Sequence, residues 1–345
     1  MDREQEQLQS LGFFGTIKES FKIIFSWKKI FTHITLTLIL PLSIFYLVQI
    51  EISDLLSSKV SNTSINTTNT TTTTRHHLYI ESISLFIFKI VDLVIYLILY
   101  LLSTAAVVYT VACIYTAKQT TYKKVMKIVP KVWKRLLVTF LWSVAIFFVY
   151  HVVAVGVFAL WIVLLSNTIA GLVVGVVILI LYLVGLVYIG VIWQLAGVVS
   201  VLEEKYGLKA MKKSRVLIKG KMGVAVLTLI LFGFCFGGID VLFERYVVYE
   251  WSRNMLISIL VAISCVVLLV PVTLLSLVAE TIIYFICKSY HHENIDKSSL
   301  SDHLEEYLGD YVRLNRSEAD HINFSSRFRY TRGGGDLGVC GVWIL

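Results

Sequence analysis

The segment LEEKYGLKAMKKSRVLIKGK, residues 202–221, carries seven Lys and Arg residues in twenty positions and lies between two long apolar runs. Both runs are long enough to cross a bilayer, because about twenty helical residues span about 30 Å of hydrocarbon. A strongly basic link between two such runs is typical of a loop at the membrane surface. The segment therefore predicts an integral membrane protein and provides a starting point for its topology.

The composition of the whole chain supports this class. Of its 345 residues, 57% are hydrophobic and 16% are charged, and the mean hydropathy is +0.77. These values are untypical of a soluble protein, and the apolar residues are gathered in runs separated by short charged links. The net charge of +8 comes mainly from cations in the links. We therefore expect anionic lipid headgroups as partners, and no nucleic acid.

Six transmembrane helices are predicted, which makes the fold class all-α integral membrane. The third and fourth apolar runs are separated only by SNTIAG, and reading them as one span would require about sixty apolar residues. Two spans joined by a tight hairpin are the better interpretation. The six predicted spans are Ile30–Ile50, Val91–Thr116, Leu136–Leu165, Leu172–Val201, Gly223–Phe243 and Leu256–Ile286.

Lys and Arg residues orient these spans. The link 117–135 carries seven cations and no acid, and 202–221 carries seven more, whereas the three links on the other side carry four in total. The positive-inside rule then places both termini in the cytosol, with the ER or the plasma membrane as the expected location. The predicted domains are a cytosolic N-terminal segment (1–29), a membrane domain (30–287) and a cytosolic tail (288–345), part of which we expect to be disordered.

The first non-cytosolic link is rich in Asn and Thr and contains three N-x-S/T sequons, at Asn62, Asn66 and Asn69. These predict N-glycosylation of a loop outside the cytosol. The alternative is that sequons arise by chance in such a low-complexity stretch.

Three basic segments share a pattern that suggests an internal repeat. In each, apolar residues fall on one helical face and cations on the other, directly before a span. Aligned without gaps, Lys18, Lys123 and Lys209 coincide, with offsets of 105 and 86 residues. We expect three pseudo-repeats, each of an interfacial amphipathic helix and two spans; the alternative is ordinary basic loops with accidental periodicity. The predicted headgroup or partner contacts are Lys123, Lys124, Lys127, Lys131, Lys134, Lys209, Lys212, Lys213, Arg215 and Lys219.

Polar residues at membrane depth are the candidates for any transport or catalytic role, because they are costly to bury in lipid. Each of them could equally make a structural pair or hydrogen bond. No motif of a zinc hydrolase, phosphate-binding loop or serine hydrolase occurs, and the five cysteines suggest neither a disulfide framework nor a zinc site. We therefore predict no metal and no cofactor. The intramembrane candidates are Asp92, His151, Gln194, Asp240 and Glu280.

Four stretches resemble a plant family of multi-pass membrane proteins of uncharacterised activity: LGFFGTIKESFKII, IYTAKQTTYKKVMKIVPKVWKRLLVTFLW, LEEKYGLKAMKKSRVLIKGK and HLEEYLGDYVRL. The third also resembles a pattern in the membrane regions attached to some bacterial glycerophosphodiester phosphodiesterases. Its residues here are Glu203 or Glu204, Gly207, Ala210, Lys213-Ser214 and Gly220. In those proteins catalysis belongs to a separate soluble domain, so the resemblance implies topology and no activity. The sequence after Leu314 departs from the plant pattern.

Three classes of function follow. The first is a non-enzymatic membrane protein that engages anionic lipid headgroups or partner proteins through its basic helices. A homo-oligomer is a separate alternative for its partner. The second is a small-solute transporter or channel, for which the repeats are favourable and the few intramembrane polar residues are not. The third is a lipid-modifying enzyme, for which no catalytic constellation can be named.

Overall fold

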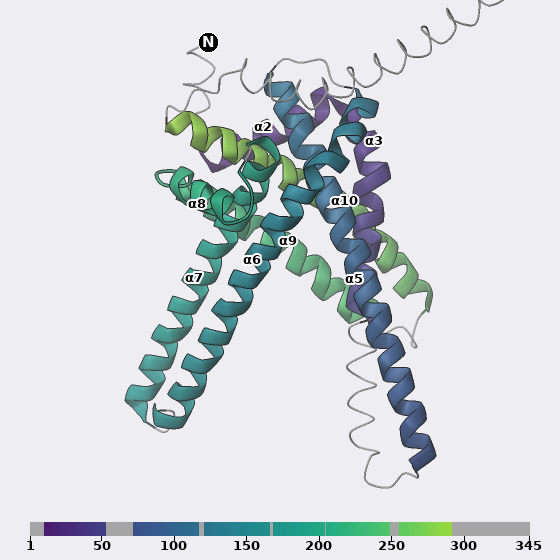
Figure 1. Ribbon diagram of the computed structural model, residues 1–345, viewed down its shortest axis with the longest axis vertical. Helices are drawn as coiled ribbons and strands as arrows, with labels where there is room; N and C mark the ends of the chain where they lie inside the picture. The colour runs from purple at the N-terminus through teal and green to yellow at the C-terminus, as the bar shows by residue number, and fades with distance from the viewer. Residues whose placement is uncertain are drawn as a thin grey trace, which may run out of the picture. The chain divides into compact units, whose positions relative to one another are not determined.

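A computed structural model describes residues 10–52, 72–116, 121–165, 168–203, 205–248 and 255–291. Within these ranges the secondary structure is helical and contains no strand (Figure 1). The named helices are α2 (Phe13–Ser26), α3 (Lys28–Ile34), the π-helical turn η1 (Thr35–Ile39), α5 (Thr72–Tyr115), α6 (Tyr122–Leu165), α7 (Ile169–Leu202), α8 (Leu208–Leu217), α9 (Met222–Phe243), the π-helical turn η2 (Glu244–Val248) and α10 (Met255–Tyr290). Residues 40–52 continue the helix after η1.

Six helical segments are long and apolar enough to cross a membrane, which confirms the predicted number and places of the spans. α2, the first turns of α6, and α8 lie at the same end of the bundle, which we call the basic end (Figure 1). The candidate spans are Lys28–Ile52, Phe86–Tyr115, Tyr122–Leu164, Ala170–Leu202, Met222–Val248 and Met255–Tyr290.

The chain divides into two compact units, residues 1–296 and 297–345. The second unit lies outside the described residues, as does most of the predicted tail domain. The three sequons at Asn62, Asn66 and Asn69 also lie outside them.

A widened turn precedes the proline of the first span. In η1 the backbone N–H of Leu40 bonds to the carbonyl oxygen of Thr35, one residue further back than in an α-helix. Pro41 follows directly, and its ring would clash with the carbonyl four residues earlier in a regular α-helix. The π-helical turn widens the backbone there, so the first span continues through Pro41.

The second basic segment is the beginning of a long span and does not form a helix of its own. α6 runs without interruption from Tyr122 through Pro130 to Leu165. Val125, Ile128 and Val129 are buried in the turns before the proline. Their packing offsets the roughly 3 kcal/mol that an interior proline costs a helix.

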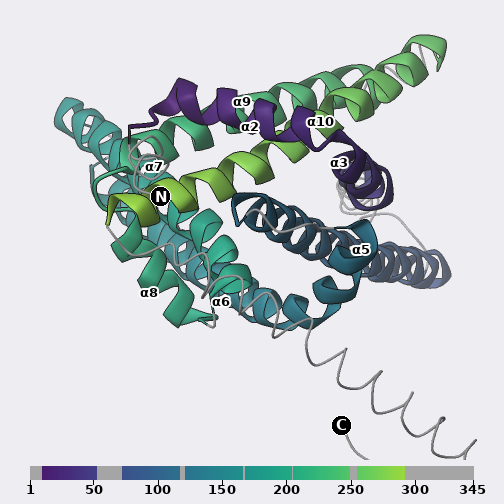
Figure 2. The same cartoon turned by 90° about the horizontal axis from the view of Figure 1, so that it is seen from above.

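The second half of α10 forms the centre of the bundle at the basic end. Helix α10 as a whole packs against α2, η1, α5, α7, α8, α9 and η2, and Figure 2 shows α10 crossing between α2 and α5. Every residue from Thr281 to Cys287 is buried, including the large side chains of Tyr284 and Phe285. A stretch that is buried all round, with no polar face, is what a central helix requires.

At the opposite end the helices separate into smaller groups. A cluster of buried residues joins the first span, α9, η2 and α10: Leu47, Ile239, Phe243, Val247, Cys265 and Leu269. The far halves of α6 and α7 pack mainly on each other, and their remaining apolar side chains are exposed, as expected for surfaces that face lipid.

Candidate functional site

Helix α8 is held against the bundle by the residues of the basic segment 202–221. Gly207 has a φ of +61°, a conformation that favours glycine, and its N–H donates to Thr139 Oγ1 at 2.8 Å. Ser214 Oγ donates to the carbonyl oxygen of Ile192 on α7 at 2.9 Å. The face packed on α7 is small and apolar, and its buried residues are Ala210, Met211, Ser214 and Leu217.

The end of α8 is fixed by the last residues of α10. Gly220 has a φ of +95°, and a Cβ atom at this position would overlap the ring of Tyr290. His291 Nε2 lies 3.0 Å from the carbonyl oxygens of Leu217 and Lys219. The imidazole of His291 thereby binds two carbonyl oxygens at the C-terminal end of α8, where the regular hydrogen bonds of the helix end.

Glu203 connects the start of the same segment to α10. Its carboxylate accepts a hydrogen bond from the Tyr284 hydroxyl at 2.9 Å and lies 3.8 Å from Lys288 Nζ and 3.7 Å from Lys205 Nζ. The Glu, Gly, Ala, Ser and Gly positions of the pattern quoted from the sequence thus have structural roles in docking α8.

The predicted cations face away from these packed surfaces. Lys209, Lys212, Arg215 and Lys219 are exposed, and Lys213 is half-buried. On α6 the apolar face is buried at Val125 and Val129, and all five lysines opposite are exposed: Lys123, Lys124, Lys127, Lys131 and Lys134. The apolar arcs of these two segments therefore pack on protein, and the cations form the outer surface.

Helix α2 has the reverse arrangement. The face packed against α10 and α9 is buried at Thr16, Ser20 and Ile23. The aromatic face is exposed, with 84% of Phe14, 45% of Phe21 and 70% of Phe25 accessible. Exposed lysines, Lys18 and Lys22, flank the aromatic face. This face was predicted from the sequence, but the bundle does not cover it.

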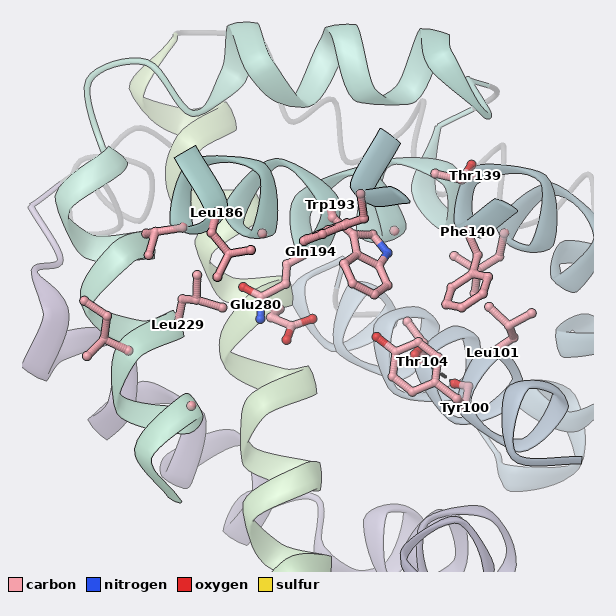
Figure 3. Close-up of a pocket in the computed structure, with 17 residues that line it drawn as sticks. Tyr100, Leu101, Thr104, Thr139, Phe140, Leu186, Trp193, Gln194, Leu229 and Glu280 are labelled. Carbon is pink, nitrogen blue, oxygen red and sulfur yellow. Dashed lines mark hydrogen bonds between the residues drawn. The ribbon is translucent and has the colours of Figure 1, made fainter. Parts of the chain in front are cut away.

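A cavity of about 460 Å³ opens among the helices at membrane depth. Residues of α5, α6, α7, α9 and α10 line it, and most of them are apolar (Figure 3). Its polar side chains include those of Tyr100, Thr104, Thr139, Gln194 and Glu280. Cavities of this size and character are typical of small-molecule sites.

Of the five intramembrane candidates, the structure brings Gln194 and Glu280 together in this cavity. Figure 3 shows both side chains directed into it from α7 and α10. One carboxylate oxygen of Glu280 accepts a hydrogen bond from Ser276 Oγ at 3.1 Å. The lining thus combines an amide, a carboxyl group and a large apolar surface.

The other three candidates lie outside the cavity lining. His151 is exposed on α6, with Nδ1 2.8 Å from the carbonyl oxygen of Phe147. Asp92 is buried on α5, and its hydrogen-bond partner Gln49 lies on the first span. Asp240 accepts a hydrogen bond of 2.8 Å from the hydroxyl of Tyr46 on the first span.

A row of tyrosines extends from Asp240 to the cavity. The ring of Tyr46 lies 6.1 Å from that of Tyr96, which lies 6.3 Å from that of Tyr100 in the cavity lining. Asp240 Oδ1 is buried without a hydrogen-bond partner. Three tyrosine rings therefore lie between Asp240 and the cavity that Glu280 lines.

The aromatic part of the lining was not predicted from the sequence. Tyr100, Phe140, Phe147 and Trp193 all contribute to it. The sequence did contain one signal that Gln194 and Glu280 belong together. They are 86 residues apart, which is the same offset that aligns Lys123 with Lys209.

Among the described residues, no three His, Cys, Asp or Glu side chains come close enough to hold a metal ion. No curated protein and no solved structure matches the chain. A family model described as a domain of unknown function (DUF8558) matches residues 1–323, which include all of the described helices. The match covers most of the chain, so the protein belongs to the DUF8558 family.

Proposed function

We propose that this multi-pass membrane protein is non-enzymatic and engages anionic lipid headgroups through the basic helices at one end. Its exposed α2 face is the observation that carries this proposal. The aromatic rings of Phe14, Phe21 and Phe25 point away from the bundle, beside Lys18 and Lys22. An amphipathic helix with such a face inserts its apolar side at the headgroup boundary while its cations attract anionic lipid.

The cations of α6 and α8 add to this attraction. A Lys or Arg near an anionic membrane surface contributes about 1 kcal/mol. The exposed cations of both segments lie at the basic end together with α2 (Figure 1). In the proposed topology this end and both termini are cytosolic, in the ER or the plasma membrane, where the cytosolic leaflet supplies the anionic lipid.

The burial pattern supports three pseudo-repeats. Under offsets of 105 and 86 residues, Ser20, Val125 and Met211 are equivalent, and all three are buried. The equivalent set Ile23, Ile128 and Ser214 is also buried, and the set Lys18, Lys123 and Lys209 is exposed. These three sets agree, whereas the equivalent residues Ile24, Val129 and Arg215 are half-buried, buried and exposed, so the match covers part of the three segments.

Lipid contact by α2 can be tested in the full-length protein in nanodiscs. A cysteine-free variant carries one environment-sensitive fluorophore at residue 21, and a matched variant carries it at residue 209 on the cation face of α8. In phosphatidylserine nanodiscs we expect brominated lipid to quench the label at 21 and leave that at 209 bright. The quenching should weaken in phosphatidylcholine or on Lys18→Gln with Lys22→Gln. A label at 21 that stays in water in both lipids would contradict lipid engagement and leave a partner protein as the occupant of this face.

A second candidate is small-solute transport or conduction, favoured by the row of tyrosines between Asp240 and Glu280. Carboxyl groups within spans mark proton pathways in membrane proteins, and the rings of Tyr46, Tyr96 and Tyr100 lie between Asp240 and the cavity that Glu280 lines. Proteoliposomes with a trapped pH-sensitive dye and an imposed potassium diffusion potential test this. We expect proton entry that Tyr96→Phe and Asp240→Asn reduce; entry at the rate of protein-free vesicles would contradict it.

A further inference from the structure

The cavity is lined by an aromatic wall and by one carboxyl group. The ring of Phe140 lies 6.5 Å from that of Tyr100 and 5.8 Å from that of Trp193. Phe147 extends the wall, with its ring 5.1 Å from Trp193. Glu280 lines the same cavity from α10, where its hydrogen-bond donor is Ser276 (Figure 3).

Among the described residues, those that line the cavity include no Lys, Arg or His. The titratable group that faces Glu280 from another helix is the Tyr100 hydroxyl on α5, whereas α6, α7 and α9 contribute uncharged side chains to the lining. A carboxylate in an apolar environment is costly unless it takes up a proton or gains a cation. The site therefore has a place for one positive charge and provides none from its own lining.

We infer that the cavity binds a small organic cation with an apolar body, of the alkylammonium class, with Glu280 as its counter-charge. Aromatic rings attract such cations through their π faces, most strongly where water is excluded. The volume of about 460 Å³ is within the range of small-molecule sites. Hydrocarbon on the ligand would replace water against the lining residues Leu101, Leu136 and Leu229. This inference does not depend on lipid engagement by the basic helices.

The internal offset provides a way to move the charge within the cavity. Gln194 and Glu280 occupy equivalent positions of α7 and α10 under the 86-residue offset, and both point into the same space. Exchanging them gives the pair Gln194→Glu with Glu280→Gln. The exchange conserves composition, and the side chains differ little in volume, so the cavity keeps one carboxyl group.

The experiment measures binding of hexyltrimethylammonium to the full-length protein in dodecyl maltoside micelles by equilibrium dialysis. Hexanoate and 1-hexanol, of the same chain length, serve as anionic and neutral competitors. We expect the cation to bind at least tenfold more tightly than either competitor. Glu280→Gln should weaken binding at least tenfold, and the exchanged pair should recover it to within about threefold of the original affinity. Thermal unfolding monitored by fluorescence checks that each variant is folded.

Binding of the cation also competes with protonation of Glu280. Because the ligand requires the ionised carboxylate, the affinity of the original protein should fall as the pH is lowered, and that of Glu280→Gln should be flat. Equal affinity for hexyltrimethylammonium and 1-hexanol, or full binding by a folded Glu280→Gln variant, would overturn the inference. If Glu280→Gln does not fold, the comparison of ligands and the pH dependence of the original protein decide the outcome.

Discussion

The hydroxyl of Ser214 on α8 donates a hydrogen bond to the carbonyl oxygen of Ile192 on α7 at 2.9 Å. Ser214 is fully buried, and this bond attaches α8 to the span formed by α7. Ser214→Ala should lower the free energy of unfolding by about 1 kcal/mol, the net value of a buried hydrogen bond. Hydrogen exchange should become faster in the amides of α8 before those of α7.

Ser264→Ala is the matched control for this change. Ser264 is exposed and donates to the carbonyl oxygen of Val261 in its own helix. Its loss should change stability by less than about 0.5 kcal/mol. Equal effects of the two substitutions would show that the Ser214 bond does not hold α8 in place.

Gly220 predicts a second, larger effect in the same segment. Its φ of +95° disfavours any side chain, and an added Cβ would overlap Tyr290. Gly220→Ala should therefore destabilise the protein by about 1–3 kcal/mol, measured as the midpoint of thermal unfolding in detergent. Three residues later, a Cβ at Gly223 meets nothing within 4 Å, and Gly223→Ala should be neutral or stabilise α9 by up to about 1 kcal/mol. Similar losses from both would contradict the docked geometry of Gly220.

Six spans and one basic end could be predicted from the sequence because both depend on local composition. Hydropathy alone identifies a run of twenty apolar residues as a span. A simple 3.6-residue period identifies the helical face that carries the lysines of residues 123–134. What each apolar face contacts is not local. The arcs of α6 and α8 pack on protein, whereas Phe14 and Phe25 of α2 are left exposed, and the period is the same in all three cases.

The cavity shows the same limit at the level of single residues. Gln194 and Glu280 stand out because polar groups are rare in spans. Trp193 and Phe140 do not stand out in the sequence, because an aromatic side chain in a span can face either lipid or a cavity. Only the crossing of α5, α6, α7, α9 and α10 brings these residues into one lining.

The Tyr46–Asp240 hydrogen bond predicts a coupled pair between the first and fifth spans. The bond is 2.8 Å long, and the other carboxylate oxygen of Asp240 is buried without a partner. Tyr46→Phe removes the donor and should cost about 1–3 kcal/mol. Asp240→Asn should cost less, because the amide oxygen still accepts from the hydroxyl.

A double-mutant cycle measures this coupling. Unfolding free energies of the original protein, the two single variants and the Tyr46→Phe, Asp240→Asn pair should give an interaction energy of at least about 0.5 kcal/mol. Additive effects would mean that the two side chains do not interact in the membrane.

The far half of the α6–α7 hairpin packs closely at Gly175. Trp161 Nε1 donates to the carbonyl oxygen of Gly171 at 2.8 Å, and a Cβ at Gly175 would overlap the same indole ring. Gly175→Ala should therefore displace Trp161 and destabilise the hairpin by about 1–3 kcal/mol, the usual cost of overpacking. Gly156 on α6 is the control, because a Cβ there meets nothing within 4 Å. We expect Gly175→Ala to lose stability and Gly156→Ala to keep it. Gly175→Ala should also shift the tryptophan emission, and Trp161→Phe should abolish that shift. An unchanged emission spectrum would show that the hairpin closes without this contact.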